Sequence, residues 1–148
     1  MEMVYYDDIE LHKSEILGDY LVDKEEAVEF AKKWDPQLFH IDEEAAKSLP
    51  TKGLIVSAVY TLAVITRLGV MKGTQMVNLA GLGLENVRFP IPIRPGDHIT
   101  VSAQVIEKRE SKNRPDAGIV RSAIEVKNQN GQICFTLESI NLVAKRHK

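Results

Sequence analysis

The side chains best suited to chemistry lie in residues 34–42 (WDPQLFHID), where Asp35 and His40 are five residues apart. Proline disfavours helical backbone at the preceding residue, so a helix that reaches Asp35 should end there and the chain should turn before His40. The apolar neighbours would shield the pair from water, which raises the pKa of a carboxylate or lowers that of a histidine. The pair is therefore a candidate for general acid–base catalysis near neutral pH.

The same spacing recurs in Asp7 and His12, but without a proline and within a polar, acidic segment. We interpret this second copy as coincidence. For the first copy, the alternative is that Asp35 is only a turn-forming acid and His40 a core histidine. The helix stop, the aromatic neighbours and the apolar segment that follows distinguish the first copy from the second, but on the residues alone the turn-forming role is the simpler interpretation.

The composition indicates one ordinary globular domain spanning residues 1–148, with 44% hydrophobic and 27% charged residues. A net charge of −2 gives no basic surface for nucleic acid. The longest apolar stretch, residues 54–65, is about half of what a membrane span needs, and no secretory signal opens the chain, so we expect a cytoplasmic protein. A single cysteine, Cys134, excludes an internal disulfide and is expected to be a buried structural thiol.

Helical signals come first along the chain. Asp23 is expected to cap a short amphipathic helix over residues 24–34, and Asp42 to cap another short helix rather than to act as a catalytic acid. After a turn at 50–53, residues 54–68 predict a helix that is apolar nearly all round and must be buried on most sides. Tyr60 and Thr66 on it are expected to be core residues.

Strand patterns fill the second half of the chain. Extended or alternating segments cover residues 77–89, 99–107, 119–126 and 133–143, with a proline-rich loop at 90–97 and an Asn-Gly hairpin turn at 128–131. Only a sheet can cover the apolar helix in so short a chain. The sequence therefore predicts an α+β fold in which an antiparallel sheet curls round a central apolar helix.

With these elements in place, the chain resembles the MaoC-like acyl dehydratases, which include R-specific enoyl-CoA hydratases and have the hotdog fold. The resemblance covers about residues 21–143. It is carried by four segments, at residues 30–42 (FAKKWDPQLFHID), 53–58 (GLIVSA), 87–97 (VRFPIPIRPGD) and 114–120 (RPDAGIV).

The resemblance implies hydration of an enoyl thioester, or the reverse dehydration, with Asp35 and His40 as the acid–base pair acting on a water molecule. It also implies an N–H donor for the thioester oxygen at Ala58, where the family has glycine. Ser57 stands where many relatives have His or Ser, and Gln37 where the hydratases often have Asn. Ser57, Ala58 and Gln37 are thus candidate substrate-binding residues, and no metal or other cofactor is implied.

The expected substrate is an acyl-CoA or an acyl-carrier-protein thioester, and an exposed sheet edge predicts a homodimer or a larger assembly of dimers. Two other functions stay open: a hotdog thioesterase, and a non-catalytic acyl-thioester binder, for which Ala58 is the main reason. Four basic residues could contact coenzyme A phosphates, but we interpret them first as a solvated charged surface: Arg88, Arg109, Lys112 and Arg114.

Overall fold

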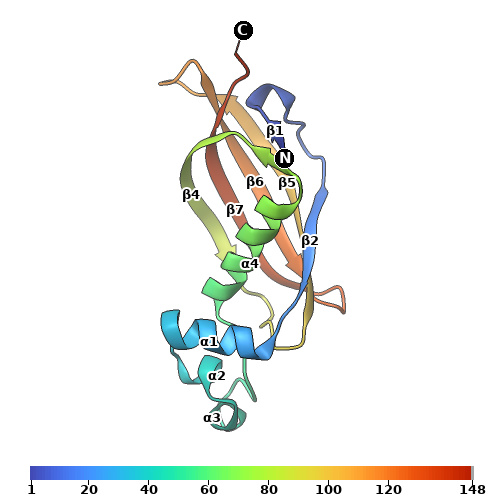
Figure 1. Ribbon diagram of the computed structural model, residues 1–148, viewed down its shortest axis with the longest axis vertical. Helices are drawn as coiled ribbons and strands as arrows, with labels where there is room; N and C mark the ends of the chain where they lie inside the picture. Colours follow the sequence, from blue (N-terminus) through green and yellow to red (C-terminus); the bar gives the residue numbers. More distant parts are fainter. Residues whose placement is uncertain (148) are drawn as a thin grey trace.

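The structure, a computed structural model, describes residues 1–147. Its main sheet has five strands in the order β2-β5-β6-β7-β4, and neighbouring strands are antiparallel. The strands of this sheet are β2 (Glu15–Leu21), β4 (Asn78–Arg88), β5 (His98–Glu110), β6 (Ala117–Lys127) and β7 (Ile133–Ala144). Helix α4 (Ala58–Met71) lies across one face of the sheet (Figure 1). The predicted sheet wrapped round a central helix is confirmed.

Three short helices gather below one end of the sheet, at the N-terminal end of α4 (Figure 1). These are α1 (Lys24–Trp34), α2 (Leu38–Ile41) and α3 (Glu43–Lys47). At the opposite end, β1 (Glu2–Val4) pairs in parallel with β3 (Thr74–Met76), and a short 3-10 helix, η1, spans Tyr6–Asp8. None of the helices within residues 1–147 has the length and apolar character to cross a membrane.

Helices α1 and α3 begin where the capping residues predict. The Asp23 carboxylate accepts from the Glu26 N–H at 2.8 Å, and the Asp42 carboxylate accepts from the Ala45 N–H at 3.0 Å. Each bond satisfies one of the free N–H groups at a helix start. Asp42 is therefore a helix cap, as predicted.

The start of α4 corrects the sequence prediction. The helix begins at Ala58 rather than at residue 54, and it continues past Gly69 to Met71. Residues before Ala58 are extended because their N–H groups have partners elsewhere: Ile55 donates to Phe39 O at 3.0 Å and Val56 donates to Ile93 O at 2.7 Å. These two bonds fix the segment between α3 and α4 against the short helices and the proline-rich loop.

The N-terminal half of α4 packs on the main hydrophobic core. Tyr60, Val64 and Ile65 lie over a buried cluster that includes Val101 and Phe135. Cys134 is buried in the same cluster, as predicted, and burial raises the pKa of its thiol. The other face of α4, with Val59 and Val70, is exposed, so the prediction of burial on most sides is wrong for a single chain.

A hydrogen-bonded cluster ties α1 to the sheet and to α4. The Glu26 carboxylate accepts from the Tyr20 hydroxyl at 2.6 Å and from the Tyr60 hydroxyl at 2.7 Å. Tyr60 is a core residue, as expected, and burial together with Glu26 holds the pKa of its hydroxyl well above the ordinary value. Because β2, α1 and α4 meet at one carboxylate, the N-terminal turn of α1 has a fixed position relative to the start of α4.

Candidate active site

Asp35 lies where α1 ends. Its N–H closes the last turn by donating to Ala31 O at 2.8 Å, and Pro36 follows. The chain then runs through Gln37 into the single turn of α2, which carries His40. The helix stop expected from Pro36 is confirmed, while His40 lies on a short helix rather than on a bend alone.

Asp35 and His40 face one another, with Asp35 Oδ2 at 3.3 Å from His40 Nε2. The imidazole is 7% exposed, and its Nδ1 lies 2.7 Å from the carbonyl oxygen of Ile55. A carbonyl oxygen can only accept, so Nδ1 carries a proton and donates it to Ile55. In the neutral ring, Nε2 is then left as the proton acceptor beside the carboxylate.

The Asp35 carboxylate also accepts two side-chain hydrogen bonds. The Ser57 hydroxyl donates to Oδ2 and the Gln37 amide donates to Oδ1, both at 2.7 Å. The Ser57 bond, the Gln37 bond and the charge of His40 lower the pKa of Asp35, against the opposing effect of partial burial. The carboxylate is therefore ionised at neutral pH, where hydrogen bonds to the charged form stabilise it.

This result corrects the expected cause of activation. We expected apolar neighbours to raise the pKa of the carboxylate, but hydrogen bonds lower it. Two of those neighbours turn away from the pair: Trp34 is 62% exposed, and Leu38 is also exposed. Phe39 does pack on the imidazole, with 4.5 Å between the ring centroids.

Ser57 and Ala58 form the start of α4 beside the pair. Ser57 is 1% exposed, and its hydroxyl oxygen accepts from the Val59 N–H at 3.2 Å while donating to Asp35. Ala58 is the first helical residue, and within residues 1–147 its N–H has no hydrogen-bond acceptor. A free N–H at the positive end of a helix is suited to binding an oxygen that gains negative charge.

The five predicted site residues thus come together within one continuous stretch, residues 35–58. Asp35 contacts Gln37, His40 and Ser57 directly, and Ala58 follows Ser57. In the second copy of the spacing, Asp7 accepts instead from the Arg146 N–H at 2.7 Å, and no hydrogen bond or ion pair joins it to His12 within residues 1–147. Its interpretation as coincidence agrees with these contacts.

Arg94 has a structural role that was not predicted from the sequence. Its guanidinium donates to Leu54 O at 3.2 Å and to Thr51 O at 2.6 Å. Its backbone N–H donates to the Asp97 carboxylate at 2.9 Å. Arg94 therefore fixes the segment that carries the Ile55 carbonyl and Ser57. A basic residue beside the Pro-Gly-Asp turn was the available signal, but its acceptors are backbone carbonyls that are forty or more residues away in the chain.

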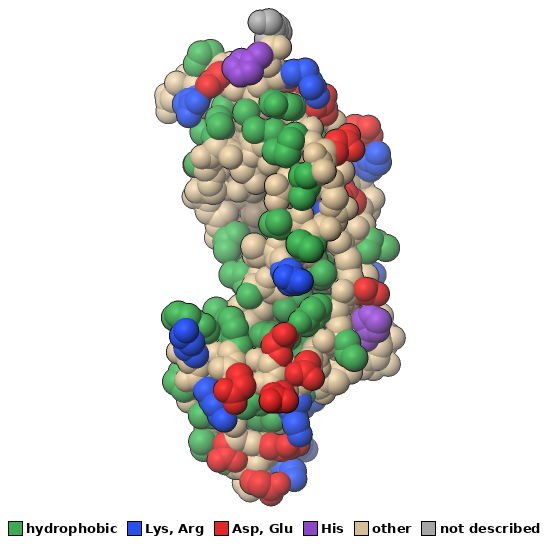
Figure 2. Space-filling view, viewed as in Figure 1, with side chains coloured by type: hydrophobic (Ala, Val, Ile, Leu, Met, Phe, Trp, Pro, Cys, Tyr) green, Lys and Arg blue, Asp and Glu red, His purple; other side chains and the backbone are tan. Residues whose placement is uncertain are grey.

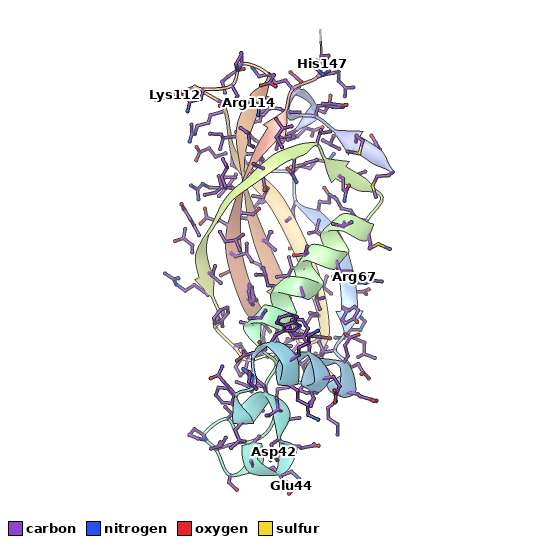
Figure 3. All side chains as sticks on the ribbon, turned by 60° about the vertical axis from the view of Figure 1, so that its left-hand side comes forward. Asp42, Glu44, Arg67, Lys112, Arg114 and His147 are labelled. Carbon is purple, nitrogen blue, oxygen red and sulfur yellow. The ribbon has the colours of Figure 1, made fainter. Side chains whose placement is uncertain are left out.

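Of the basic residues considered for coenzyme A phosphates, Lys112 and Arg114 lie at the far end of the molecule from Asp42 and the short helices (Figure 3). Arg114 forms a two-pronged ion pair with Asp116, at 3.0 and 2.7 Å. This pair is exposed and its charges are already compensated, as a solvated surface predicts.

Replacing Ser57 tests the cause of the lowered pKa. Ser57→Ala removes the hydrogen bond that lowers the pKa of Asp35 most, so we expect this pKa to rise toward its ordinary value. Stabilisation from a lowered carboxylate pKa is present above about pH 4 and is lost as pH falls through the folded-state pKa. The variant should therefore lose more unfolding free energy at pH 7 than in acid, on top of about 1 kcal/mol for the lost helix cap. Urea unfolding at both pH values and a carbon-13 titration of the Asp35 carboxyl measure this.

The matched control is Ser48→Ala, at an exposed serine that ends α3. It should leave the pKa of Asp35 unchanged. An unchanged pKa in Ser57→Ala would contradict the assignment of Ser57 as the main stabiliser of the carboxylate.

Comparison with known proteins identifies a family and related chains. The family model described as "MaoC like domain" matches residues 11–127. The chain is 30% identical over 126 residues to the uncharacterized protein YdeM of Bacillus subtilis, covering 84% of this chain and 87% of that one. It is 27% identical over 114 residues to 3-hydroxyacyl-thioester dehydratase Z of Mycobacterium tuberculosis, covering 74% of each.

Among solved structures, the MaoC-like dehydratase from Rhodospirillum rubrum superposes with a TM-score of 0.90 at 32% identity. The superposition covers 98% of this chain and 99% of that one. The similarity therefore extends over both the sheet and the short helices that carry Asp35 and His40.

Proposed function

Because the chain belongs to the MaoC-like domain family, whose members are hydratases and dehydratases, we propose that it adds or removes water across the 2,3 double bond of an enoyl thioester. The observation that carries the proposal is the Asp35–His40 pair, 3.3 Å apart beside the free N–H of Ala58. We take residues 1–148 as one domain, with the thioester of coenzyme A or of a carrier protein as substrate.

In the proposed hydration, His40 is the base. The Ile55 carbonyl keeps the proton on Nδ1, so Nε2 accepts a proton from the water as its oxygen bonds to the β-carbon. The Asp35 carboxylate holds the other hydrogen of that water and stabilises the imidazolium that forms. Because its pKa is lowered, the Asp35 carboxylate is a weak base and stays ionised. His40 is therefore the group proposed to take the proton.

The second half of the reaction returns the proton. As the β-carbon gains the hydroxyl, electrons move from the double bond toward the thioester oxygen, which becomes an enolate. The Ala58 N–H is the proposed donor to this oxygen. The imidazolium then delivers its proton to the α-carbon on the same face, giving a 3-hydroxyacyl thioester and restoring neutral His40.

The direct test is the loss of the conjugated enoyl-thioester absorbance when the protein is mixed with trans-2-enoyl-CoA of several chain lengths. Product with the mass of substrate plus water supports the proposal. Release of free thiol without hydration would instead identify a thioesterase. Tight binding without any turnover, on coenzyme A or carrier-protein substrates, would identify a non-catalytic binder.

We also propose that two copies pair along β4. This strand is an edge of the main sheet and is exposed along nearly its whole length, with Leu82 51% exposed and with Leu79 and Leu84 also exposed. Free strand edges of this kind pair readily with another chain, and a two-fold axis would join β4 to its copy. The exposed apolar face of α4 is then available for further contact.

Placing a charge on β4 should separate the two copies. In Leu82→Lys, two like charges would face each other near the two-fold axis, so we expect the variant to sediment as a monomer at micromolar concentration while the wild type sediments as a dimer. Leu21→Lys is the control, since Leu21 is an exposed leucine on β2, the opposite edge of the sheet. A dimer that survives Leu82→Lys but not Leu21→Lys would place the interface on β2.

A further inference from the structure

The sheet face beneath α4 has a polar band between two hydrophobic clusters. One cluster surrounds Val101 and Phe135, and the other surrounds Val120 and Val143 near the N-terminal segment. Between them lie small or polar side chains, with Ser122 of β6 directly opposite Ser139 of β7 in the strand register. Ala103 and Asn141 continue this band on β5 and β7. If this face of the sheet did no more than pack against α4, its side chains would be apolar throughout.

A cavity of about 640 Å³ lies above this band, and Ser122, Ser139 and Asn141 line it. On the other side it is bounded by the later turns of α4, including Thr66 and Gly69. Thr66 is exposed rather than a core residue, which corrects the expectation for it. Figure 2 shows the surface between β4 and α4 as hollowed and mostly tan, which marks uncharged polar side chains and backbone.

The polar side chains of this band have no hydrogen-bond partner among the described residues 1–147. In the hydrogen bonds made by residues 1–147, neither the Ser122 and Ser139 hydroxyls nor the Asn141 amide takes part through its side chain. Ser122 is only 8% exposed, and buried polar groups are normally hydrogen-bonded. These polar atoms face the open cavity and are not enclosed in the core, where Thr51 Oγ1 is the unpartnered side-chain atom among the described residues. They are therefore free to bond to a molecule that enters the cavity.

Among the described residues, no unpaired charge lines the cavity. Lys72 is the charged side chain that lines it within the described part of the chain, and Lys72 forms an ion pair with Glu15. Most of the remaining lining is apolar, with Leu62 and Ile65 of α4 facing Ile124 and Leu137 of the sheet among the residues that form it. An anionic group would find no counter-charge here, whereas an uncharged oxygen would find hydroxyl and amide partners.

We propose that this cavity binds the distal part of the acyl group and that the preferred substrate carries an uncharged oxygen there, a hydroxyl or a ketone, rather than a plain alkyl tail. This inference rests on the proposed function for the position of the thioester. Ala58 and Thr66 are eight residues apart on α4, or about 12 Å at 1.5 Å per residue. A medium-length acyl group therefore reaches from the Ala58 N–H to the polar band.

The test measures binding separately from chemistry. Octanoyl-CoA and 7-hydroxyoctanoyl-CoA have no double bond to hydrate, so their dissociation constants report on the cavity alone. We expect the hydroxylated thioester to bind about five- to tenfold more tightly, as one net hydrogen bond provides. In the double variant Ser122→Ala, Ser139→Ala the two constants should become nearly equal.

Ser102→Ala is the matched control, because Ser102 lies on β5 between Val101 and Ala103 and so on the opposite face of the sheet. It should keep the wild-type preference. Equal binding of the two thioesters to the wild type, binding of neither, or a preference that survives the double variant would overturn the inference.

The same pair in trans-2-enoyl form separates this inference from the proposed function. A binding preference without hydration of either compound supports the polar cavity and counts against the hydratase. Hydration of both compounds with equal binding supports the hydratase and overturns the polar cavity.

Discussion

Asp35→Asn should lower kcat/KM for enoyl-thioester hydration by about 10²- to 10⁴-fold, the range for losing a general acid–base group. The amide keeps an oxygen that can accept from Ser57, so the local structure should survive, but it has no negative charge to stabilise the imidazolium of His40. His40→Gln removes the base itself and should cause a loss in the same range. The decay of the enoyl-thioester absorbance measures both.

Two controls make this result specific. Asp7→Asn changes the carboxylate in the second copy of the spacing, and we expect its activity to equal that of the wild type. Urea unfolding of each variant shows whether lost activity reflects lost structure. An Asp35→Asn protein that is folded and hydrates at the wild-type rate would remove Asp35 from the mechanism.

Ala58→Pro should lower kcat by about 10²- to 10³-fold, as the loss of one donor to a developing oxyanion does. Proline has no N–H, and the first helical position is where it is best tolerated. Ser57 already has φ −61° and ψ 138°, which suits the residue before a proline. The substitution therefore removes the proposed donor with little change to α4, and single-turnover hydration measures the loss.

Ala58→Gly is the control, because it keeps the N–H and introduces the glycine that the family resemblance implies at this position. We expect its activity to equal or exceed that of the wild type, since the methyl group beside the thioester is removed. Full activity in Ala58→Pro, with unfolding unchanged, would show that another group binds the thioester oxygen.

The parts of the fold that the sequence predicted well depend on local signals. Helix α1 spans residues 24–34 as predicted. Asp23 caps its start and Pro36 prevents it from continuing, and both residues lie within two positions of the helix ends. The hairpin at 128–131 is equally local, with the Gly131 N–H donating to Asn128 O at 3.0 Å. In both cases the residues that determine the structure are adjacent in the chain.

The parts that the sequence did not predict depend on distant partners. Helix α4 begins late because the N–H groups of Ile55 and Val56 bond to Phe39 and Ile93, which no local pattern indicates. The pKa of Asp35 is lowered by the Ser57 hydroxyl, which is 22 residues away along the chain. The sequence identified Asp35 and His40 as the pair, but it did not predict that the pKa of Asp35 would be lowered.

The polar band of the sheet was also only partly predictable from the sequence. The alternation in β6 places Ser122 on the same face as Val120 and Ile124, so the sequence predicts that the Ser122 side chain lies on the inner face of the sheet. Its position opposite Ser139, beneath an open space and without a protein partner, follows only from the register of β6 and β7.

The five candidate site residues lie in one continuous stretch, residues 35–58, and this arrangement affects how proteins of this kind can acquire new substrates. The groups proposed for the reaction are encoded in one short stretch, whereas the floor of the cavity is encoded in β5, β6 and β7. Substitutions accumulating in the three strands can alter which acyl groups fit while the reactive segment is inherited unchanged. A mutational library confined to the inward-facing positions of these strands would sample new substrates without disturbing the catalytic apparatus.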